Sequence, residues 1–339
     1  MRVLITGGAG FIGSHLAERL ISEETEVWIL DDLSTGSMLN IDPLTRSPLF
    51  HYRIGSVMNE ELVGEMVDRV DVVFHLAAAV GVKLIVTNPT KTIETNIRGS
   101  EVVLQSAAKK GKLTVIASTS EVYGKGKRIP YSEDDDLVLG PTTKSRWGYA
   151  CSKAIDEYLA LAYVKERDLP VLIVRLFNTV GPRQTGRYGM VLPTFVRQGL
   201  AGEDITVFGT GDQQRCFADV ADVVQALMML VNTPSTYDQV FNIGSDREIS
   251  INDLAELVRV KTGGLSRVVH VPYDEAYDEG FEDLLRRVPD TTKLHGAIGF
   301  RPATPVETIV DRVIEFTLRE GGGSRTGRPR HAGSAAARE

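Results

Sequence analysis

A glycine-rich turn near the N-terminus constrains the fold of this chain more than any other sequence feature. Gly7, Gly10 and Gly13 directly follow the apolar run Val3 to Ile5 and precede a helix-like segment from Ser14 to Ile21. Between a strand and a helix, such glycines let the backbone turn tightly and approach a pyrophosphate, which faces the free N–H groups of the helix N-terminus. Glycine spacing alone is a weak signal. The order of strand, turn and helix favours a dinucleotide site over a glycine-rich turn without a ligand.

Two carboxylates follow the second apolar run, where a dinucleotide site requires an acidic group. Asp31 and Asp32 stand at the end of the run Val27 to Leu30. A carboxylate in this position accepts hydrogen bonds from the adenosine ribose and repels a 2′-phosphate. The sequence therefore predicts NAD, rather than NADP, as the cofactor.

Short β-branched runs alternate with amphipathic segments in the first half of the chain, as in a doubly wound parallel sheet of the Rossmann type. With 339 residues, 42% of them hydrophobic, the chain can bury one large and one smaller core. We predict an α/β fold with an NAD-binding Rossmann domain over 1–177 and a smaller C-terminal substrate-binding α/β lobe over 178–320. Residues from about 216 to 243 are candidates to return to the first domain, and 321–339 are predicted to be a disordered tail. The expected strands are Val3 to Ile5, Val27 to Leu30, Val72 to Phe74, Leu113 to Ala117 and Val171 to Val174.

The charge and cysteine content argue against several classes of partner. The formal net charge is −7, and no long Lys/Arg stripe precedes the tail, so we expect neither nucleic acid nor a membrane as partner. The two cysteines, Cys151 and Cys216, do not form a metal-ligand spacing with the six histidines, so no metal is predicted. Neither a signal peptide nor a run of about 18 apolar residues is visible, and we expect a cytoplasmic enzyme.

A tyrosine and a lysine four residues apart are the predicted catalytic pair. Tyr149 and Lys153 lie on one face of a helix expected to run to Tyr163, so both can act on the same ligand. The adjacent ammonium and a positive nicotinamide ring would lower the pKa of the tyrosine toward working pH, which makes it a general base. By itself this pair is often only a surface contact. Ser118, Thr119, Ser120 and Glu121 support the catalytic interpretation, because they follow the strand Leu113 to Ala117 and fall at the carboxyl edge of the sheet. Thr119 can hydrogen-bond the reacting hydroxyl.

Together these motifs resemble the extended short-chain dehydrogenase/reductase family of nucleotide-sugar enzymes, from Met1 to about residue 318. The resemblance rests on Gly7 to Gly13, Asp31 to Gly36, His75 to Ala78, Arg175 to Gln184 and Gly211 to Phe217. One departure is Ser56, where the family commonly has an aspartate near the adenine. The resemblance implies that NAD is contacted by Gly7, Gly10, Phe11, Ile12, Gly13, Asp31, Asp32, Ser34, Val57, Leu76, Ala77, Ala78, Asn96, Ser118, Tyr149 and Lys153. His75 could instead only cap a strand, and Asn96 could instead only tie two strands together.

The same resemblance implies a UDP-sugar substrate. Its contacts are expected at Thr119, Asn178, Val191, Leu192, Val207, Phe208, Arg215 and Arg287. Arg215 is expected to pair with phosphate, and the alternative is a surface salt bridge to Asp219. For Arg287 the alternative partner is Glu282.

Transient oxidation at the sugar C4 is the step that the resemblance implies first, with Tyr149, Lys153, Thr119, Ser120 and Glu121 as catalytic residues. The segment Arg175 to Gln184 is similar to that of 4-epimerases, and we predict conversion of UDP-glucuronate to UDP-galacturonate. The segment Thr119 to Gly124 instead resembles UDP-glucuronate decarboxylases, which are the alternative. UDP-glucose 4-epimerisation and a non-catalytic NAD sensor are further alternatives. Helices Asn96 to Lys109 and Tyr149 to Tyr163 resemble the pair that forms a homodimer interface in this family.

Overall fold

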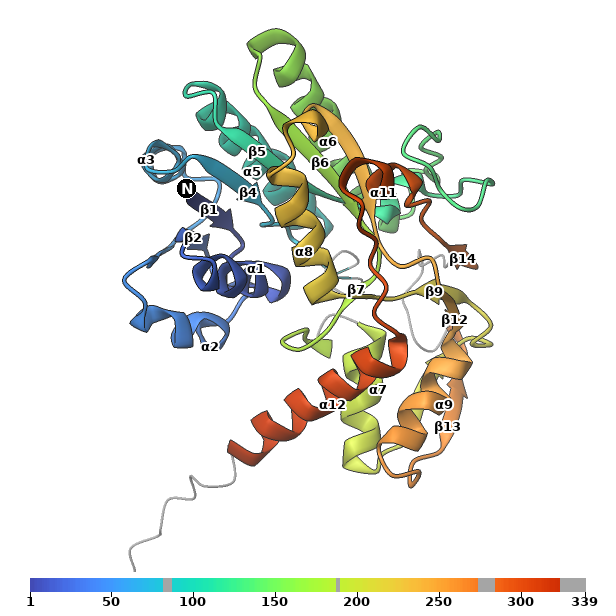
Figure 1. The fold of residues 1–339 in the computed structure, drawn as a ribbon. Helices are drawn as coiled ribbons and strands as arrows, with labels where there is room; N and C mark the ends of the chain where they lie inside the picture. Colours follow the sequence, from blue (N-terminus) through green and yellow to red (C-terminus); the bar gives the residue numbers. More distant parts are fainter. Residues whose placement is uncertain (82–86, 187–189, 274–283, 324–339) are drawn as a thin grey trace, which may run out of the picture.

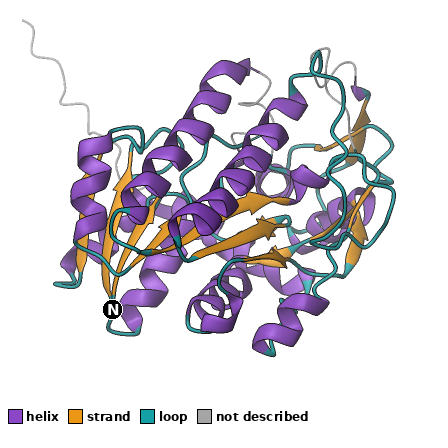
Figure 2. Cartoon of the chain, turned by 90° about the horizontal axis from the view of Figure 1, so that it is seen from above, coloured by secondary structure: helices purple, strands orange, loops and turns teal. Residues whose placement is uncertain are grey.

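A seven-stranded parallel sheet forms the centre of the molecule, and helices cover both of its faces (Figures 1 and 2). The computed structural model describes residues 1–81, 87–186, 190–273 and 284–323. The strand order is β11-β6-β5-β4-β1-β2-β3, and every neighbouring pair runs parallel. The predicted Rossmann-type α/β fold is therefore confirmed. The sheet also contains two strands that were not predicted individually, β3 and β11.

The elements of the large domain follow the predicted alternation of strand and helix. The strands of the central sheet are β1 (Arg2–Thr6), β2 (Glu26–Asp31), β3 (Phe50–Ile54), β4 (Val72–His75), β5 (Leu113–Thr119), β6 (Val171–Leu176) and β11 (Gln239–Ile243). The helices around it are α1 (Phe11–Ser22), α2 (Met38–Ile41), α3 (Glu60–Asp68), α5 (Pro89–Ala108), α6 (Arg146–Arg167), α8 (Val220–Val231) and α11 (Thr292–Ile298), with short 3₁₀ turns η1 (Asp42–Arg46), η2 (Ser120–Tyr123) and η4 (Pro234–Thr236).

The sheet separates two apolar cores. On one face, side chains of α1, α8 and α11 pack on the strands, and on the other face α3, α5 and α6 do so. Val3, Leu4 and Ile5 of β1 are all fully buried, because a central parallel strand has a helix layer on each side. This explains why the strands read as continuous apolar runs rather than as alternating ones.

A smaller lobe has its own core. It comprises β7 (Thr179–Val180), α7 (Val191–Ala201), β8 (Ile205–Phe208), β9 (Gln214–Cys216), β10 (Ala218–Asp219), β12 (Glu248–Ser250), α9 (Ile251–Lys261), β13 (Val268–Val271), β14 (Arg286–Arg287) and α12 (Val306–Gly323). Helices α7, α9 and α12 pack together over β8. Ser250 caps α9, where its hydroxyl accepts a hydrogen bond of 2.9 Å from the Asp253 N–H.

The chain crosses between the two lobes more than once. After β10 it returns to the large domain through α8 and β11, and β11 pairs with β6 at the edge of the central sheet. Helix α12 continues to Gly323. Residues 321–323, which were predicted to begin the tail, are therefore the end of this helix. The remaining tail, 324–339, lies outside the described residues.

A buried ion pair joins the end of the sheet to the catalytic segment. Arg175 on β6 donates to both carboxylate oxygens of Glu157 on α6, with distances of 2.7 to 3.2 Å, and both side chains are almost fully buried. Glu157 also accepts a hydrogen bond from Ser118 at the end of β5. The Arg175 guanidinium stacks 4.8 Å from the ring centre of Tyr123, whose hydroxyl donates to Asn242 on β11 at 2.7 Å. The pair thus holds three strand ends together.

We expect Glu157→Gln to lower the free energy of unfolding by about 3–5 kcal/mol, because it leaves the Arg175 guanidinium buried without its counter-ion. Glu65→Gln is the matched control, since Glu65 pairs with Arg69 on the surface at 2.9 Å and an exposed pair contributes about 1 kcal/mol at most. Urea denaturation of both variants measures the difference. Equal, small effects would show that the buried pair does not hold these strand ends.

Candidate active site

The glycine turn after β1 has the shape that a pyrophosphate requires. Gly7 has φ of +71°, and a Cβ there would lie 2.8 Å from the backbone of Ala77. A Cβ on Gly13 would lie 2.4 Å from the Gly7 carbonyl oxygen. Only glycine fits at both positions, so the backbone at the start of α1 stays open to a ligand, and no side chain caps Gly10 at that helix N-terminus. These residues fit NAD.

Asp31 at the end of β2 holds the glycine turn in place. Its carboxylate accepts hydrogen bonds from the N–H groups of Ala9, at 2.9 Å, and Leu33, at 2.8 Å. Burial raises the pKa of Asp31, and these two N–H groups offset part of the rise. The neighbouring Asp32 accepts from the Ser34 N–H at 2.9 Å. The predicted acidic pair is therefore brought to the glycine turn, as a dinucleotide site requires.

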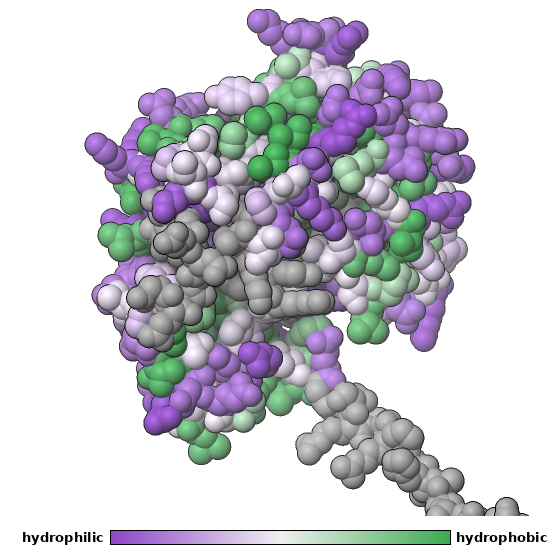
Figure 3. All heavy atoms as spheres, turned by 180° about the vertical axis from the view of Figure 1, so that it is seen from behind, coloured by the Kyte–Doolittle hydropathy of each residue, from purple (hydrophilic) through white to green (hydrophobic). Residues whose placement is uncertain are grey.

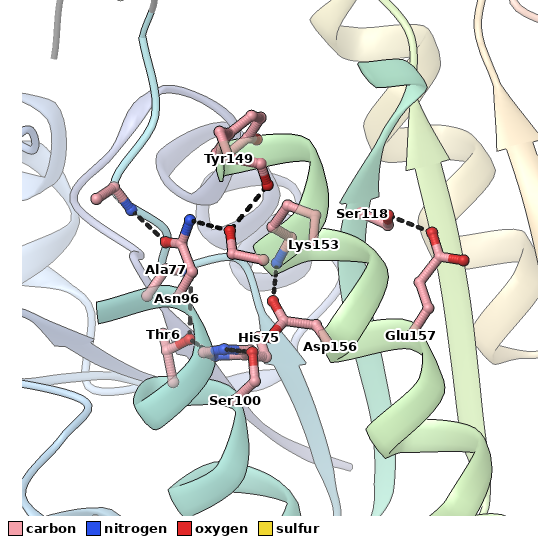
Figure 4. A network of polar contacts seen from close by, with 12 residues as sticks. Thr6, His75, Ala77, Asn96, Ser100, Ser118, Tyr149, Lys153, Asp156 and Glu157 are labelled. Atoms are coloured by element: carbon pink, nitrogen blue, oxygen red, sulfur yellow. Dashed lines mark hydrogen bonds and ion pairs between the residues drawn. The ribbon is translucent and has the colours of Figure 1, made fainter. Parts of the chain in front are cut away.

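Behind the glycine turn, a chain of polar side chains links β1, β4 and α5 (Figure 4). His75 contacts Thr6 through Nδ1 at 2.8 Å and Ser100 through Nε2 at 3.2 Å. Burial lowers the pKa of His75 to about 3, and the Lys153 charge adds to this effect, so the imidazole is neutral. The Asn96 side chain accepts from Ala79 N–H at 2.8 Å and donates to the Ser152 hydroxyl at 3.2 Å. Both residues thus connect neighbouring elements, and the contact of Asn96 with NAD stays a prediction.

The catalytic pair lies on the buried face of α6, but its charges differ from the prediction (Figure 4). Lys153 donates to Asp156 at 2.6 Å, and both side chains are almost fully buried. Burial, followed by the negative charge of Glu121, raises the pKa of Tyr149, although a hydrogen bond from Thr119 opposes the rise. Burial thus opposes the lowering of this pKa that the Lys153 ammonium was expected to produce, and Asp156 compensates part of that charge. The effect of a nicotinamide ring on this pKa stays a prediction.

Glu121 and Arg287 form an ion pair that the sequence did not predict. Glu121 lies on η2 directly after β5, and Arg287 lies on β14. One oxygen of the Glu121 carboxylate accepts from Nη1 of Arg287, and the other accepts from Nη2 of Arg146 at 3.0 Å. Burial raises the pKa of Glu121, but the charges and hydrogen bonds of the two arginines outweigh this effect. The pKa of Glu121 is therefore below its ordinary value. An ionised carboxylate thus lies next to Tyr149.

The two arginines predicted to bind the substrate stand side by side. Arg215 on β9 is the register partner of Arg287 on β14, so both project from neighbouring strands. Arg215 is 7% exposed and donates to the Gln214 carbonyl at 2.8 Å. Asp219, the alternative partner, pairs with Arg312 at 2.6 Å instead. Glu282, the alternative partner of Arg287, lies outside the described residues.

The other predicted substrate contacts divide into two groups. Leu192 and Val207 are fully buried in the core of the small lobe, so only their backbone could meet a ligand. Val191 is partly buried against that core, and Phe208 is 37% exposed. Asn178 donates to the Cys216 carbonyl at 3.2 Å, which links the residue before β7 to the end of β9. Among the predicted NAD contacts, Val57 is buried near Gly99, whereas Leu76, Ala77 and Ala78 follow β4 directly.

Two residues of the site, Asp156 and Arg146, were missed in the sequence. Each left a signal, because Arg146, Tyr149, Lys153 and Asp156 are spaced by three, four and three residues, which places them on one face of a helix. Within the described part of the chain, no group of three or more His, Cys, Asp or Glu side chains is arranged to hold a metal. No helix among these residues is long and apolar enough to cross a membrane.

Residues 3–244 match the model of the NAD dependent epimerase/dehydratase family. The chain belongs to this family. NAD is the cofactor that the family uses, as the glycine turn predicts.

Two relatives in sequence and one solved structure are similar to this chain over most of its length. The chain is 43% identical over 317 residues to a UDP-N-acetyl-alpha-D-glucosaminuronate decarboxylase of Bacillus cytotoxicus, covering 93% of this chain and 97% of that protein. It is 34% identical over 319 residues to UDP-glucuronic acid decarboxylase 1 of Danio rerio, covering 94% and 73%. Among solved structures, a UDP-glucose 4-epimerase of Thermotoga maritima with UDP-glucose matches with a TM-score of 0.84 at 30% identity, covering 94% and 99%.

The decarboxylases among these proteins overturn the predicted 4-epimerase activity. The 43% identical protein and further relatives are decarboxylases of UDP-linked uronic acids. The prediction relied on the segment Arg175 to Gln184, but in the structure Arg175 is a buried partner of Glu157. That segment therefore reports on the shared fold and does not distinguish between the two reactions.

We expect Gly13→Ala to lower NAD affinity about tenfold or more, because the new Cβ would meet backbone atoms of Gly7 and Gly8 at 2.4 and 2.8 Å. A tenfold change corresponds to about 1.4 kcal/mol. Gly64→Ala in α3 is the control, since a Cβ there meets no described atom within 4 Å, and it should stabilise the fold by about 0.5–1 kcal/mol. Calorimetric titration with NAD compares them. Unchanged affinity in Gly13→Ala would remove the turn from the cofactor site.

Proposed function

We propose that this chain is an NAD-dependent decarboxylase of a UDP-linked hexuronic acid, the reaction that the sequence left as its alternative. The observation that carries the proposal is the pairing of Glu121 with Arg287 beside Thr119 and Tyr149. It supplies fixed charges next to the groups that would act at C4. The decarboxylases among the relatives support the same conclusion.

In the first step, Tyr149 as phenolate takes the proton of the sugar C4 hydroxyl, which Thr119 orients by a hydrogen bond. Bound NAD, held by the glycine turn, would supply the hydride acceptor for C4 oxidation and the hydride donor for the final reduction. Lys153 has three N–H donors, of which Asp156 uses one, so the others can reach the ribose of the cofactor.

The resulting C4 ketone is β to the C5 carboxylate. The bond between C5 and the carboxylate carbon breaks, carbon dioxide leaves, and the electron pair moves onto the C4 oxygen as an enolate. A proton then adds at C5 and regenerates the ketone, which is reduced. Because Glu121 is held ionised, we propose that it and Arg287 orient the proton donor at C5, a water molecule or the guanidinium itself. The Nε of Arg287 is buried and has no hydrogen-bond partner among the described residues, so it is available to such a ligand.

Arg215 is proposed to bind the diphosphate. It lies on the strand beside Arg287, and a guanidinium matches phosphate oxygens in a bidentate manner. Two cations on neighbouring strands would attract an anionic nucleotide to a chain whose overall charge is negative.

The test is incubation with UDP-N-acetylglucosaminuronate and, separately, UDP-glucuronate, followed by NMR. We expect carbon dioxide and a UDP-pentose from one of them, with the 2-acetamido sugar as the first candidate because of the 43% identical relative. Tyr149→Phe should lower the rate by about 10²–10⁴ while NAD and UDP affinity stay nearly unchanged, since only the acidic oxygen is lost. A product that keeps its carboxylate, or a tyrosine variant within a few-fold of wild type, would contradict the proposal.

We further infer that the chain forms a homodimer through α5 and α6, which pack against each other. Ile155, Tyr158 and Leu161 follow one another at three-residue intervals on α6 and are 40%, 69% and 37% exposed. Ile93 on α5 is 36% exposed. Figure 3 shows apolar residues gathered among hydrophilic ones in the upper part of the face seen from behind. Exposed apolar side chains that share a helix face favour an interface.

We expect the double variant Tyr158→Glu and Leu161→Glu to be monomeric at micromolar concentration, because the charges would be buried at the interface without partners. Light scattering measures the mass. The control is Leu39→Glu, since Leu39 is 78% exposed on α2, away from these helices. A wild-type chain that is already monomeric would refute the inference.

A further inference from the structure

Arg146 occupies a position that the proposed reaction does not yet explain. It is the first residue of α6, one helical turn before Tyr149, and its guanidinium contacts Glu121 on the side opposite Arg287. Its side chain is only 10% exposed, and the guanidinium lies 5.5 Å from the ring centre of Trp147. A cation held in this way is part of the site and not of the surface.

Titratable side chains approach Glu121 from three segments of the chain. Arg287 approaches from β14, Arg146 and Tyr149 from α6, and Tyr131 from the loop before α6. Each carboxylate oxygen of Glu121 has an arginine partner, so both the rotation of the carboxylate and its charge are fixed. Removing Arg287 would also remove the group proposed to act at C5. Arg146 is the Glu121 partner to which the proposed chemistry at C5 assigns no direct role.

We propose that Arg146 is a positioning residue that fixes the Glu121 carboxylate, so that protonation at C5 of the decarboxylated sugar occurs from one face only. The proposal rests on the proposed decarboxylase function. The physical reason is that the enolate, which remains after carbon dioxide departs, is planar at C5. It can therefore accept a proton on either face. A carboxylate locked between two guanidinium groups presents the proton donor to one side, whereas a carboxylate held by Arg287 alone can rotate.

The same contact has a consequence for the pH dependence. The two arginines lower the pKa of Glu121 against the opposing effect of burial. Loss of one of them raises this pKa, so the carboxylate becomes protonated at a higher pH. The acidic limb of the kcat profile should therefore move to higher pH in a variant without the charge and stay in place in a variant that keeps it.

The experiment uses the full chain with NAD in deuterated water, with the uronic acid substrate that the wild-type enzyme decarboxylates. Wild type should place one deuterium at C5 of the pentose in a single configuration, read by NMR. Arg146→Met should give both configurations, with kcat reduced about tenfold to a hundredfold by misplacement of the reacting groups. Arg146→Lys should recover the wild-type acidic limb, since its ammonium can still reach one oxygen. Arg167→Met removes an exposed arginine at the far end of the same helix and should behave as wild type.

The outcomes separate the two proposals. If wild type does not release carbon dioxide from either uronic acid, the proposed function fails, whatever Arg146 does. If wild type decarboxylates and Arg146→Met still deuterates C5 in one configuration with an unchanged acidic limb, the positioning role is refuted while the function stands. Should Arg146→Met unfold, the folded Arg146→Lys variant decides, because a single configuration with an unshifted limb supports the role and a shifted limb contradicts it.

Discussion

The burial of charged side chains along one face of α6 is the constraint on which the rest of the structure depends. Arg146, Lys153, Asp156 and Glu157 are nearly buried there, and each has a partner of opposite charge. An unpaired charge in this position would cost several kcal/mol, so the partners must be brought to the helix. They come from η2, from β6 and from α6 itself. The ends of β5 and β6 and the first turn after β5 are positioned as a result.

The same ion pairs influence the pKa values of Tyr149 and Glu121. Asp156 compensates the charge of Lys153, and Glu121 adds negative charge near Tyr149, so burial is not offset and the pKa of the tyrosine is raised. In the proposed function, the positive charge of the nicotinamide ring would favour the phenolate of Tyr149. The pKa of Glu121 shifts in the opposite direction: it is lowered, because two guanidinium groups outweigh the effect of burial.

The small lobe adds two cations, Arg215 and Arg287, to those that α6 of the large domain supplies at this edge. Parallel pairing of β14 with β9 places Arg287 beside Arg215, and the Arg287 side chain reaches η2 of the large domain. The lobe in turn is held by its own apolar core, in which Leu192 and Val207 are buried. In the proposed function, Arg215 binds the diphosphate and its neighbour Arg287 acts at C5. Both arginines depend on the short strand pair, so a change in register there would separate the two functions.

The local patterns of the sequence determined the Rossmann-type sheet and NAD as the cofactor, and they singled out Tyr149 and Lys153, whose catalytic role stays a prediction. Glycines between a strand and a helix, and side chains four residues apart on one helix, have geometries that neighbouring residues fix by themselves. The sequence named the segment of β11 as a candidate to return to the first domain, but its place in the sheet depends on pairing with β6. The contact of Glu121 with Arg146 and Arg287 joins three distant segments. The segment Arg175 to Gln184 favoured the wrong reaction, because its arginine serves a buried ion pair that is visible only in three dimensions. Sequence alone therefore determined the fold class and the cofactor. Only the tertiary structure decided which charges surround them, because electrostatic partners are chosen by distance in space and not by separation along the chain.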